Sequence, residues 1–119
     1  MNSKMDQIAR AFSSHQFADT YPYLSDEVRW DMVGGELITG RDAVIERCDA
    51  SAAYLAAIFT TFQRFKVVVG AESVVVDTLA TYVDSDKETT VVASCDLYDF
   101  VDGTVVEIRS YTVEVNGQA

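Results

Sequence analysis

The C-terminal part of the chain alternates apolar and polar residues in a way that predicts two long strands joined by a tight turn. One arm runs from Glu88 to Phe100 and the other from Thr104 to Val115, and both are rich in Val, Thr and Tyr. Asp102-Gly103 between them is typical of a hairpin turn. Residues 60–69 and 73–83 have the same composition and predict two further strands.

The N-terminal part has helical spacing instead. Apolar residues three and four positions apart predict a first helix from Lys4 to about Phe17, capped by Asn2 or Ser3. The residues that share its apolar face are Met5, Ile8, Phe12 and His15.

Shorter elements follow the first helix. A short helix or turn is expected from Asp19 to Leu24, and residues 25–27 end it. Val28–Val33 alternates as a strand does, and Glu36–Thr39 predicts a brief return strand. A second long helix is expected from Asp42 to about Phe59.

This order of elements defines the expected fold class. Helices followed by meandering strands are an α+β pattern, with one curved antiparallel sheet and helices packed on one face. A chain of 119 residues is long enough for one domain, and we assign residues 1–119 to it. Residues 116–119 read as a tail.

Composition narrows the function classes. The net charge of −10 argues against partners with phosphate backbones and against anionic lipid surfaces. No apolar run reaches the length of a membrane span, and the N-terminus lacks the pattern of a secretory signal. Cys48 and Cys95 are expected to be buried, reduced thiols in the cytoplasm. The single histidine excludes a histidine-based metal cluster, whereas a site built from carboxylates alone stays open.

Asp96 is the most informative polar residue. It lies in the middle of a predicted strand, where Asp is disfavoured. Either its carboxyl group points to solvent, or it is retained for a chemical role. The residues predicted to share its face of the strand are Val92, Ser94, Tyr98 and Phe100.

Two other residues each have two readings. His15, at the end of the first helix, either interacts favourably with the helix dipole when protonated or has a functional role, as part of a pocket wall or as a proton carrier. Trp30 and Asp31 are neighbours in a strand, so they face opposite sides, and Trp30 fits the core or a dimer interface as well as a pocket.

Apolar runs at 67–69 and 74–76 suggest a sheet covered on both faces, and hence a homodimer through the outer face.

Three segments carry a resemblance to a known superfamily. They are Phe17–Trp30, the Gly40-Arg41-Asp42-Ala43-Val44 helix start, and the closing hairpin from Asp96 to Tyr111. In order and spacing they resemble the nuclear transport factor 2-like superfamily, which includes SnoaL-like polyketide cyclases and ketosteroid isomerases. The resemblance implies a cone-shaped sheet around about three N-terminal helices, a cystatin-like α+β barrel with an apolar pocket.

The resemblance also implies roles for two carboxylates. The stretch Asp31–Gly40 is similar to the isomerase segment whose leading Asp is the general base. The stretch Val91–Phe100 is similar to the isomerase strand whose protonated Asp donates a hydrogen bond to the enolate, a role that falls on Asp96. Proton transfer next to a carbonyl needs such a base and such a neutral acid.

The chain departs from the isomerases at one position, because its first helix offers no Tyr for the oxyanion hole. The expected site therefore combines catalytic Asp31 and Asp96 with substrate-binding residues Phe12, His15, Tyr23, Trp30 and Tyr98. It would act without a cofactor on a hydrophobic, carbonyl-bearing small molecule. The alternative is a non-catalytic module of the same fold that binds a ligand or a partner protein.

Overall fold

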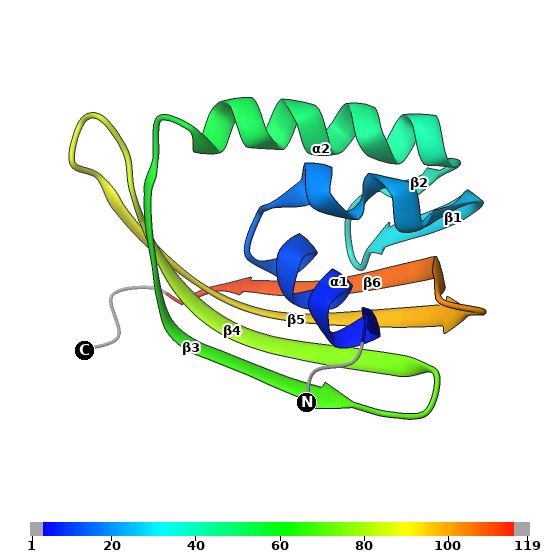
Figure 1. Cartoon of the computed structure of the whole chain (residues 1–119). Coiled ribbons are helices and arrows are strands. Elements are labelled where there is room, and N and C mark those ends of the chain that lie inside the picture. Colours follow the sequence, from blue (N-terminus) through cyan, green and yellow to red (C-terminus); the bar gives the residue numbers. More distant parts are fainter. Residues whose placement is uncertain (1–3, 116–119) are drawn as a thin grey trace.

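Within residues 4–115, six β-strands form one curved sheet whose concave side holds the helices (Figure 1). This computed structural model describes residues 4–115, so the predicted cap at Asn2 or Ser3 and the predicted tail at 116–119 lie outside the described residues. The elements in chain order are α1 (Lys4–Ser13), the 3-10 helix η1 (Phe17–Tyr23), β1 (Leu24–Met32), β2 (Leu37–Thr39), α2 (Arg41–Leu55), β3 (Phe59–Val69), β4 (Ser73–Val83), β5 (Thr89–Val101) and β6 (Thr104–Glu114).

The strand order across the sheet is β2-β1-β6-β5-β4-β3. The expected α+β fold, a cone-shaped sheet wrapped around helices, is confirmed. The sheet is mixed rather than wholly antiparallel, because β1 and β6 run parallel, with Trp30 opposite Ile108. Among the described strands, the edge strands β2 and β3 do not pair, so the sheet does not close into a barrel. The chain crosses through α2 from one edge to the other, and the meander then returns β6 to the side of β1 (Figure 1).

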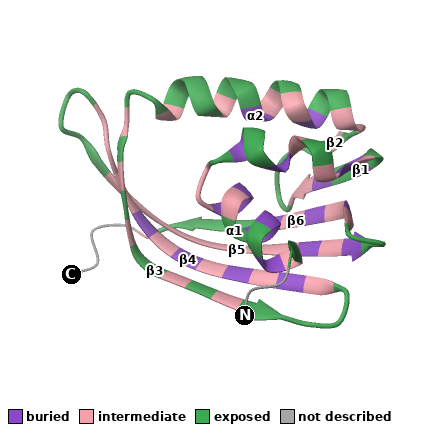
Figure 2. Ribbon diagram, in the orientation of Figure 1, coloured by how far each residue is buried: buried purple, intermediate pink, exposed green. Residues whose placement is uncertain are grey.

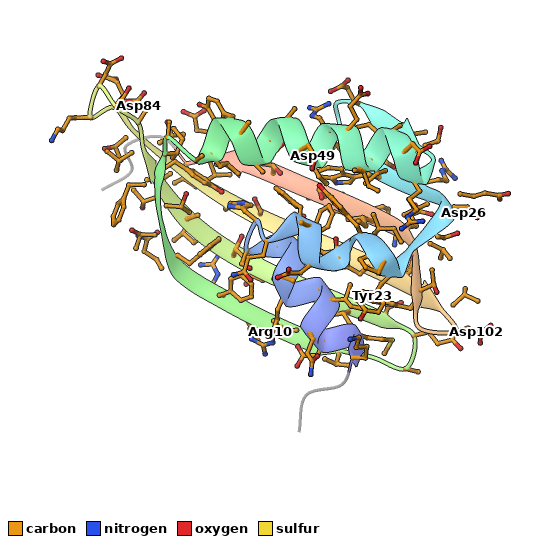
Figure 3. The ribbon with its side chains drawn as sticks, turned by 45° about the horizontal axis from the view of Figure 1, so that its top comes forward. Arg10, Tyr23, Asp26, Asp49, Asp84 and Asp102 are labelled. Carbon is orange, nitrogen blue, oxygen red and sulfur yellow. The ribbon has the colours of Figure 1, made fainter. Side chains whose placement is uncertain are left out.

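The core lies where the concave face of the sheet meets the helices (Figure 2). Val74 and Val76 of β4 are fully buried, as the strand alternation requires. Tyr98 of β5 and Ile108 of β6 are also fully buried. These residues lie toward the β5–β6 turn, which Asp102 marks in Figure 3. Packing is therefore closest at this end of the cone.

Helix α1 ends at Ser13, earlier than the sequence predicts. The amide of Gln16 donates to the carbonyl of Ala11 at 2.8 Å, and the amide of His15 donates to the carbonyl of Phe12 at 3.1 Å. This pair of bonds is the Schellman motif, which requires a left-handed residue just past the helix. His15 fills that position with φ of 73°, where glycine is the usual residue. The motif redirects the chain and stops the helix.

Other boundaries also differ from the prediction. β1 already begins at Leu24, so residues 25–27 belong to a strand rather than to the end of a helix. Helix α2 ends at Leu55, and Phe59, expected near its end, is the first residue of β3. The limits of β4 match the prediction, and those of β5 and β6 match it to within one residue at each end.

The convex face of the sheet is not covered by the helices (Figure 1). Apolar side chains are exposed on it, with Val68 at 53% and Val113 at 63% of their full accessibility. Cys95 lies on this face as a half-buried free thiol, whereas Cys48 is a free thiol buried in the core. In residues 4–115 no helix is both long and apolar enough to cross a membrane.

Candidate functional site

A cavity of about 580 Å³ lies between the concave face of the sheet and the helices. Strands β4, β5 and β6 form its floor, α2 lies above it, and the end of α1 forms one wall. On β5 its lining consists of Val92, Ser94 and Asp96, so it lies nearer the β4–β5 turn, marked by Asp84 in Figure 3, than the packed core does. We call this space the inner cavity.

Much of the wall of the inner cavity is aromatic or aliphatic. Phe12 packs edge-to-face against Trp30 and Phe17, with ring centroids 5.0 Å away in each case. All three rings line the cavity. The inner cavity therefore suits an apolar ligand with a few polar groups.

Asp96 points into the inner cavity from the middle of β5. Ser13 Oγ donates a hydrogen bond to its Oδ2 at 2.8 Å, and the hydroxyl of Ser110, its neighbour on β6, is a second donor. The hydroxyls of Ser13 and Ser110 each have a second hydrogen-bond partner. The hydroxyl of Tyr98 lies 2.5 Å from Ser13 Oγ, and Trp30 Nε1 donates to Ser110 Oγ at 3.0 Å. Asp96 is thus the end point of two hydrogen-bonded chains.

Burial raises the pKa of Asp96 above its ordinary value, although hydrogen bonds from Ser110, Ser13 and Tyr98 oppose this rise. Desolvation is the larger effect, so the carboxyl group holds its proton more tightly than it would in water. A neutral carboxyl group in an apolar cavity can donate a hydrogen bond or a proton to a ligand oxygen.

His15 forms part of the cavity wall within a group of aromatic rings. Its ring centroid is 5.8 Å from that of Phe17, 5.8 Å from that of Phe62 and 6.0 Å from that of Tyr82. Burial lowers the pKa of His15, which favours the neutral imidazole. A neutral imidazole carries one nitrogen that can accept a proton. The inner cavity therefore holds a potential acid and a potential base.

Four residues predicted for the site line the inner cavity, namely Phe12, His15, Trp30 and Asp96. Tyr98 lies beneath them, fully buried, with its ring 5.8 Å from the ring of Phe12. The structure thus brings these five side chains together. Their roles in binding or catalysis stay predictions.

Asp31 is not brought to this group. Trp30 and Met32 both line the inner cavity, so the alternation of β1 directs Asp31 to the convex side, where its neighbour on β6 is Arg109. The expected arrangement of Asp31 and Asp96 around one pocket is therefore absent. The two carboxylates lie on opposite faces of the sheet.

Tyr23 lies outside the inner cavity as well. It is the last residue of η1, and Figure 3 labels its position there. It lines a separate groove between α1, η1 and β3, and Lys4 Nζ stands 4.3 Å from its ring centre. This contact is a cation–π interaction between α1 and η1.

Sequence reasoning did not single out Ser13 and Ser110. Both are small polar residues with no motif of their own. One signal was available, because the alternation of β6 puts Ser110 on the same face as the apolar Ile108. A serine on an apolar strand face commonly has a polar partner, and here that partner is Asp96.

The described residues do not form a metal-binding cluster. Within 4–115, no three side chains of His, Cys, Asp or Glu lie close enough together to hold one ion. Asp96 is surrounded by hydroxyl groups and His15 by aromatic rings.

Comparison with known families agrees with this architecture. The model of the SnoaL-like domain matches residues 5–108. The chain therefore belongs to the SnoaL-like family, and its fold is that of the nuclear transport factor 2-like superfamily. No curated protein matched the chain at a significant level.

Several solved structures share the fold. An NTF2-like protein of unknown function from Cytophaga hutchinsonii is 25% identical, with a TM-score of 0.83 over 92% of this chain and 96% of that one. A protein from Xanthomonas campestris pv. campestris, proposed to be a polyketide cyclase, is 16% identical, with a TM-score of 0.69 over 92% of both chains. A proposed isomerase from Bacillus subtilis is also 16% identical, with a TM-score of 0.69 over 95% of this chain and 90% of that one. The last two are similar in fold alone.

Proposed function

We propose that the protein binds a hydrophobic carbonyl compound in the inner cavity and moves a proton next to its carbonyl group without a cofactor. The observation that carries this proposal is Asp96, a carboxyl group at the floor of an apolar cavity whose pKa burial raises. A proposed polyketide cyclase and a proposed isomerase of the same fold support this reaction class.

In this proposal Asp96 is the acid and His15 is the base. The carbonyl oxygen of the ligand accepts a hydrogen bond from the neutral carboxyl group of Asp96. His15 takes a proton from the adjacent carbon, the C–H electron pair forms a carbon–carbon double bond, and the oxygen receives the proton of Asp96. In a β,γ-unsaturated ketone His15 returns the proton to the γ carbon, the enol hydroxyl returns its proton to Asp96, and the conjugated isomer forms. When the enol carbon instead attacks a second carbonyl, that carbonyl oxygen takes the proton from His15, the enol hydroxyl returns its proton to Asp96, and a ring forms.

The two hydrogen-bonded chains serve this step. As Asp96 gives up its proton, Ser13 and Ser110 each donate to the carboxylate that forms. Tyr98 and Trp30 orient these hydroxyls in advance, so little reorganisation is needed. In this scheme Asp31 has no part, because it lies on the convex face.

The test follows deuterium uptake by NMR at the carbon next to the carbonyl of butyrophenone, a neutral aryl ketone. Wild-type protein should speed the uptake, and Asp96→Asn and His15→Asn should each slow it by about 100-fold, the size expected for the loss of a general acid or base. Asn keeps the shape of Asp96 and tolerates the left-handed backbone at His15. Asp31→Asn is the matched control and should keep the wild-type rate. Equal rates in wild type and Asp96→Asn would rule out the proposal.

One observation favours a second function, a binding module without catalysis. Asp31, the base that the family resemblance implies, does not line the inner cavity. A binding module would take up the ketone and change the fluorescence of Trp30, the single tryptophan of the chain, with no deuterium uptake above background. Binding without exchange in wild type would therefore select this alternative.

We further propose that two copies pair through the convex face of the sheet. Val68 and Val113 on this face are exposed, and the neighbours of Val113 along its row, Ala93 and Leu79, are also apolar. Covering such a surface is favourable, because apolar area leaves water. The inner cavity opens on the other side of the sheet, so pairing of this kind leaves its lining residues unaffected.

A further inference from the structure

The inner cavity carries a cation that the proton-transfer proposal does not use. Arg47, in the middle of α2, is the one Lys or Arg among the lining residues in the described part of the chain. Ser51, one turn further along α2, lines the same wall. The guanidinium of Arg47 forms an ion pair with Glu36.

Glu36 is held in front of Arg47 by the turn that follows β1. The amide of Met32 donates to the carbonyl of Glu36 at 2.9 Å, and the amide of Gly35 donates to the carbonyl of Met32 at 2.7 Å. Gly34 takes φ of 86° in this turn, and both glycines line the inner cavity. The ion pair therefore joins α2 to the turn at the rim of the cavity, where the side chains of Arg47 and Glu36 are 38% and 64% exposed.

Arg47 provides the permanent charge of the cavity wall. Burial favours the neutral forms of the other ionisable groups there, since it raises the pKa of Asp96 and of Tyr82 and lowers the pKa of His15. Glu36 is not part of the lining, and its contact with Arg47 is open to water. A ligand inside the cavity consequently meets one positive group at the rim and a hydrogen-bond donor at the floor.

We propose that Arg47 binds a carboxylate at one end of an otherwise apolar ligand whose carbonyl group lies at Asp96. This inference rests on the proposed function and narrows its substrate class to apolar keto acids. The planar guanidinium matches a carboxylate in a bidentate pair, which Lys does not offer. An exposed ion pair contributes little, so the ligand carboxylate displaces Glu36 and takes its place.

The net charge of the chain makes a cation at the cavity important for an anionic ligand. The chain carries a formal charge of −10, so its surface as a whole repels an anionic ligand. A cation on the cavity wall lowers this barrier locally. Its effect should weaken with added salt, because Arg47 is partly exposed.

The experiment measures binding by calorimetry for two matched aryl ketones, β-benzoylpropionate and its methyl ester. Wild-type protein should bind the acid about 10-fold more tightly than the ester, the size expected for one charge-assisted pair. Arg47→Met keeps the aliphatic stem and removes the charge, so it should abolish the preference while ester binding stays unchanged. Glu36→Gln removes the competing carboxylate and should strengthen binding of the acid alone. Arg64→Met, which breaks an exposed ion pair with Asp77 on the convex face, is the matched control and should change neither affinity.

The outcomes separate this inference from the proposed function. Equal binding of acid and ester by wild type, or an acid preference that survives in Arg47→Met, overturns the role of Arg47 and leaves proton transfer at Asp96 standing. Arg47→Met that weakens both ligands equally shows a structural role for Arg47 and also overturns the inference. Failure of wild type to bind either ketone overturns the proposed function and the inference together.

Discussion

The hydroxyl of Ser13 donates a hydrogen bond of 2.8 Å to Asp96, joining the last residue of α1 to the middle of β5. The two residues are far apart in the sequence, and the fold brings them together at the wall and floor of the inner cavity. The same hydrogen bond therefore holds α1 against the sheet and influences the pKa of the Asp96 carboxyl group. A change at Ser13 should therefore affect both stability and proton affinity.

Ser13→Ala should lower the free energy of unfolding by about 1 kcal/mol, because it removes the hydrogen bonds of the Ser13 hydroxyl to Asp96 and Tyr98, while Tyr98 keeps Asp96 as a partner. It should also raise the pKa of Asp96 further, since one hydrogen bond to the carboxylate is lost. Urea denaturation measures the first effect. The neighbouring variant Ser14→Ala loses only a bond of 3.2 Å to the carbonyl of Ala11 and serves as control. Equal losses in the two variants would contradict the assigned role of Ser13.

Asp96→Asn should stabilise the protein relative to wild type in a way that depends on pH. Because burial raises the pKa of Asp96 in the folded state, the folded protein binds this proton more tightly than the unfolded chain does. The stability that this proton contributes is fully present below the pKa of Asp in the unfolded chain, about 4, and it is lost as pH rises through the pKa of Asp96 in the folded protein. Asn cannot ionise, so the variant escapes this loss.

Melting curves across a pH series check this sign. The melting temperature of Asp96→Asn minus that of wild type should increase as pH rises from about 4 and then level off. The low-pH points are the internal control, because both proteins are neutral at this position there. A difference that instead grows as pH falls would mean that the folded state lowers the pKa of Asp96.

Substitutions at His15 separate backbone strain from the contribution of the ring. His15→Gly and His15→Ala both remove the contacts with Phe17, Phe62 and Tyr82. Gly accepts φ of 73° freely, whereas Ala does not, so the Gly variant should be about 1 kcal/mol more stable than the Ala variant. Chemical denaturation of the two variants gives the difference directly. Greater stability of the Ala variant would show that the left-handed turn does not persist in solution.

Pairing of two copies through the convex face predicts a sensitive position at Val113. Val113→Glu places a charge on the exposed apolar row and should convert a dimer to a monomer in light scattering coupled to gel filtration. Val101→Glu is the matched control, since Val101 is similarly exposed, at 54%, but lies at the β5–β6 turn. A wild-type protein that is monomeric at high concentration would contradict the proposed pairing.

The fold was predictable from the sequence because its strands are long and regular. The period of two in β5 correctly places Asp96, Tyr98 and Phe100 on one face. The parallel pairing of β1 with β6 was not predictable from the same pattern, since alternation along a strand does not report the direction of its neighbour. The early end of α1 was missed because His15 occupies a position where glycine is the usual signal.

The site was predictable only in part, because some of its residues have no recognisable signal in the sequence. Aromatic and acidic residues such as Phe12 and Asp96 stand out in a sequence, but the hydroxyls that hold Asp96 do not. The family resemblance pointed to Asp31 as a site residue. The alternation of β1 alone left open whether Trp30 or Asp31 faces the pocket. Packing directs Trp30 to the concave side, because its indole donates a hydrogen bond to Ser110 and packs against the ring of Phe12 there.

The most direct test of the account is the titration of the Asp96 carboxyl group, followed by carbon NMR of protein labelled at aspartate carboxyl carbons and assigned with the Asp96→Asn variant. We expect this carbon to titrate above the ordinary range of aspartate, so that the carboxyl group keeps its proton at a pH where exposed aspartates have lost theirs. A signal that titrates within or below the ordinary range would show an ionised Asp96. That result would contradict its proposed role as the acid of the inner cavity.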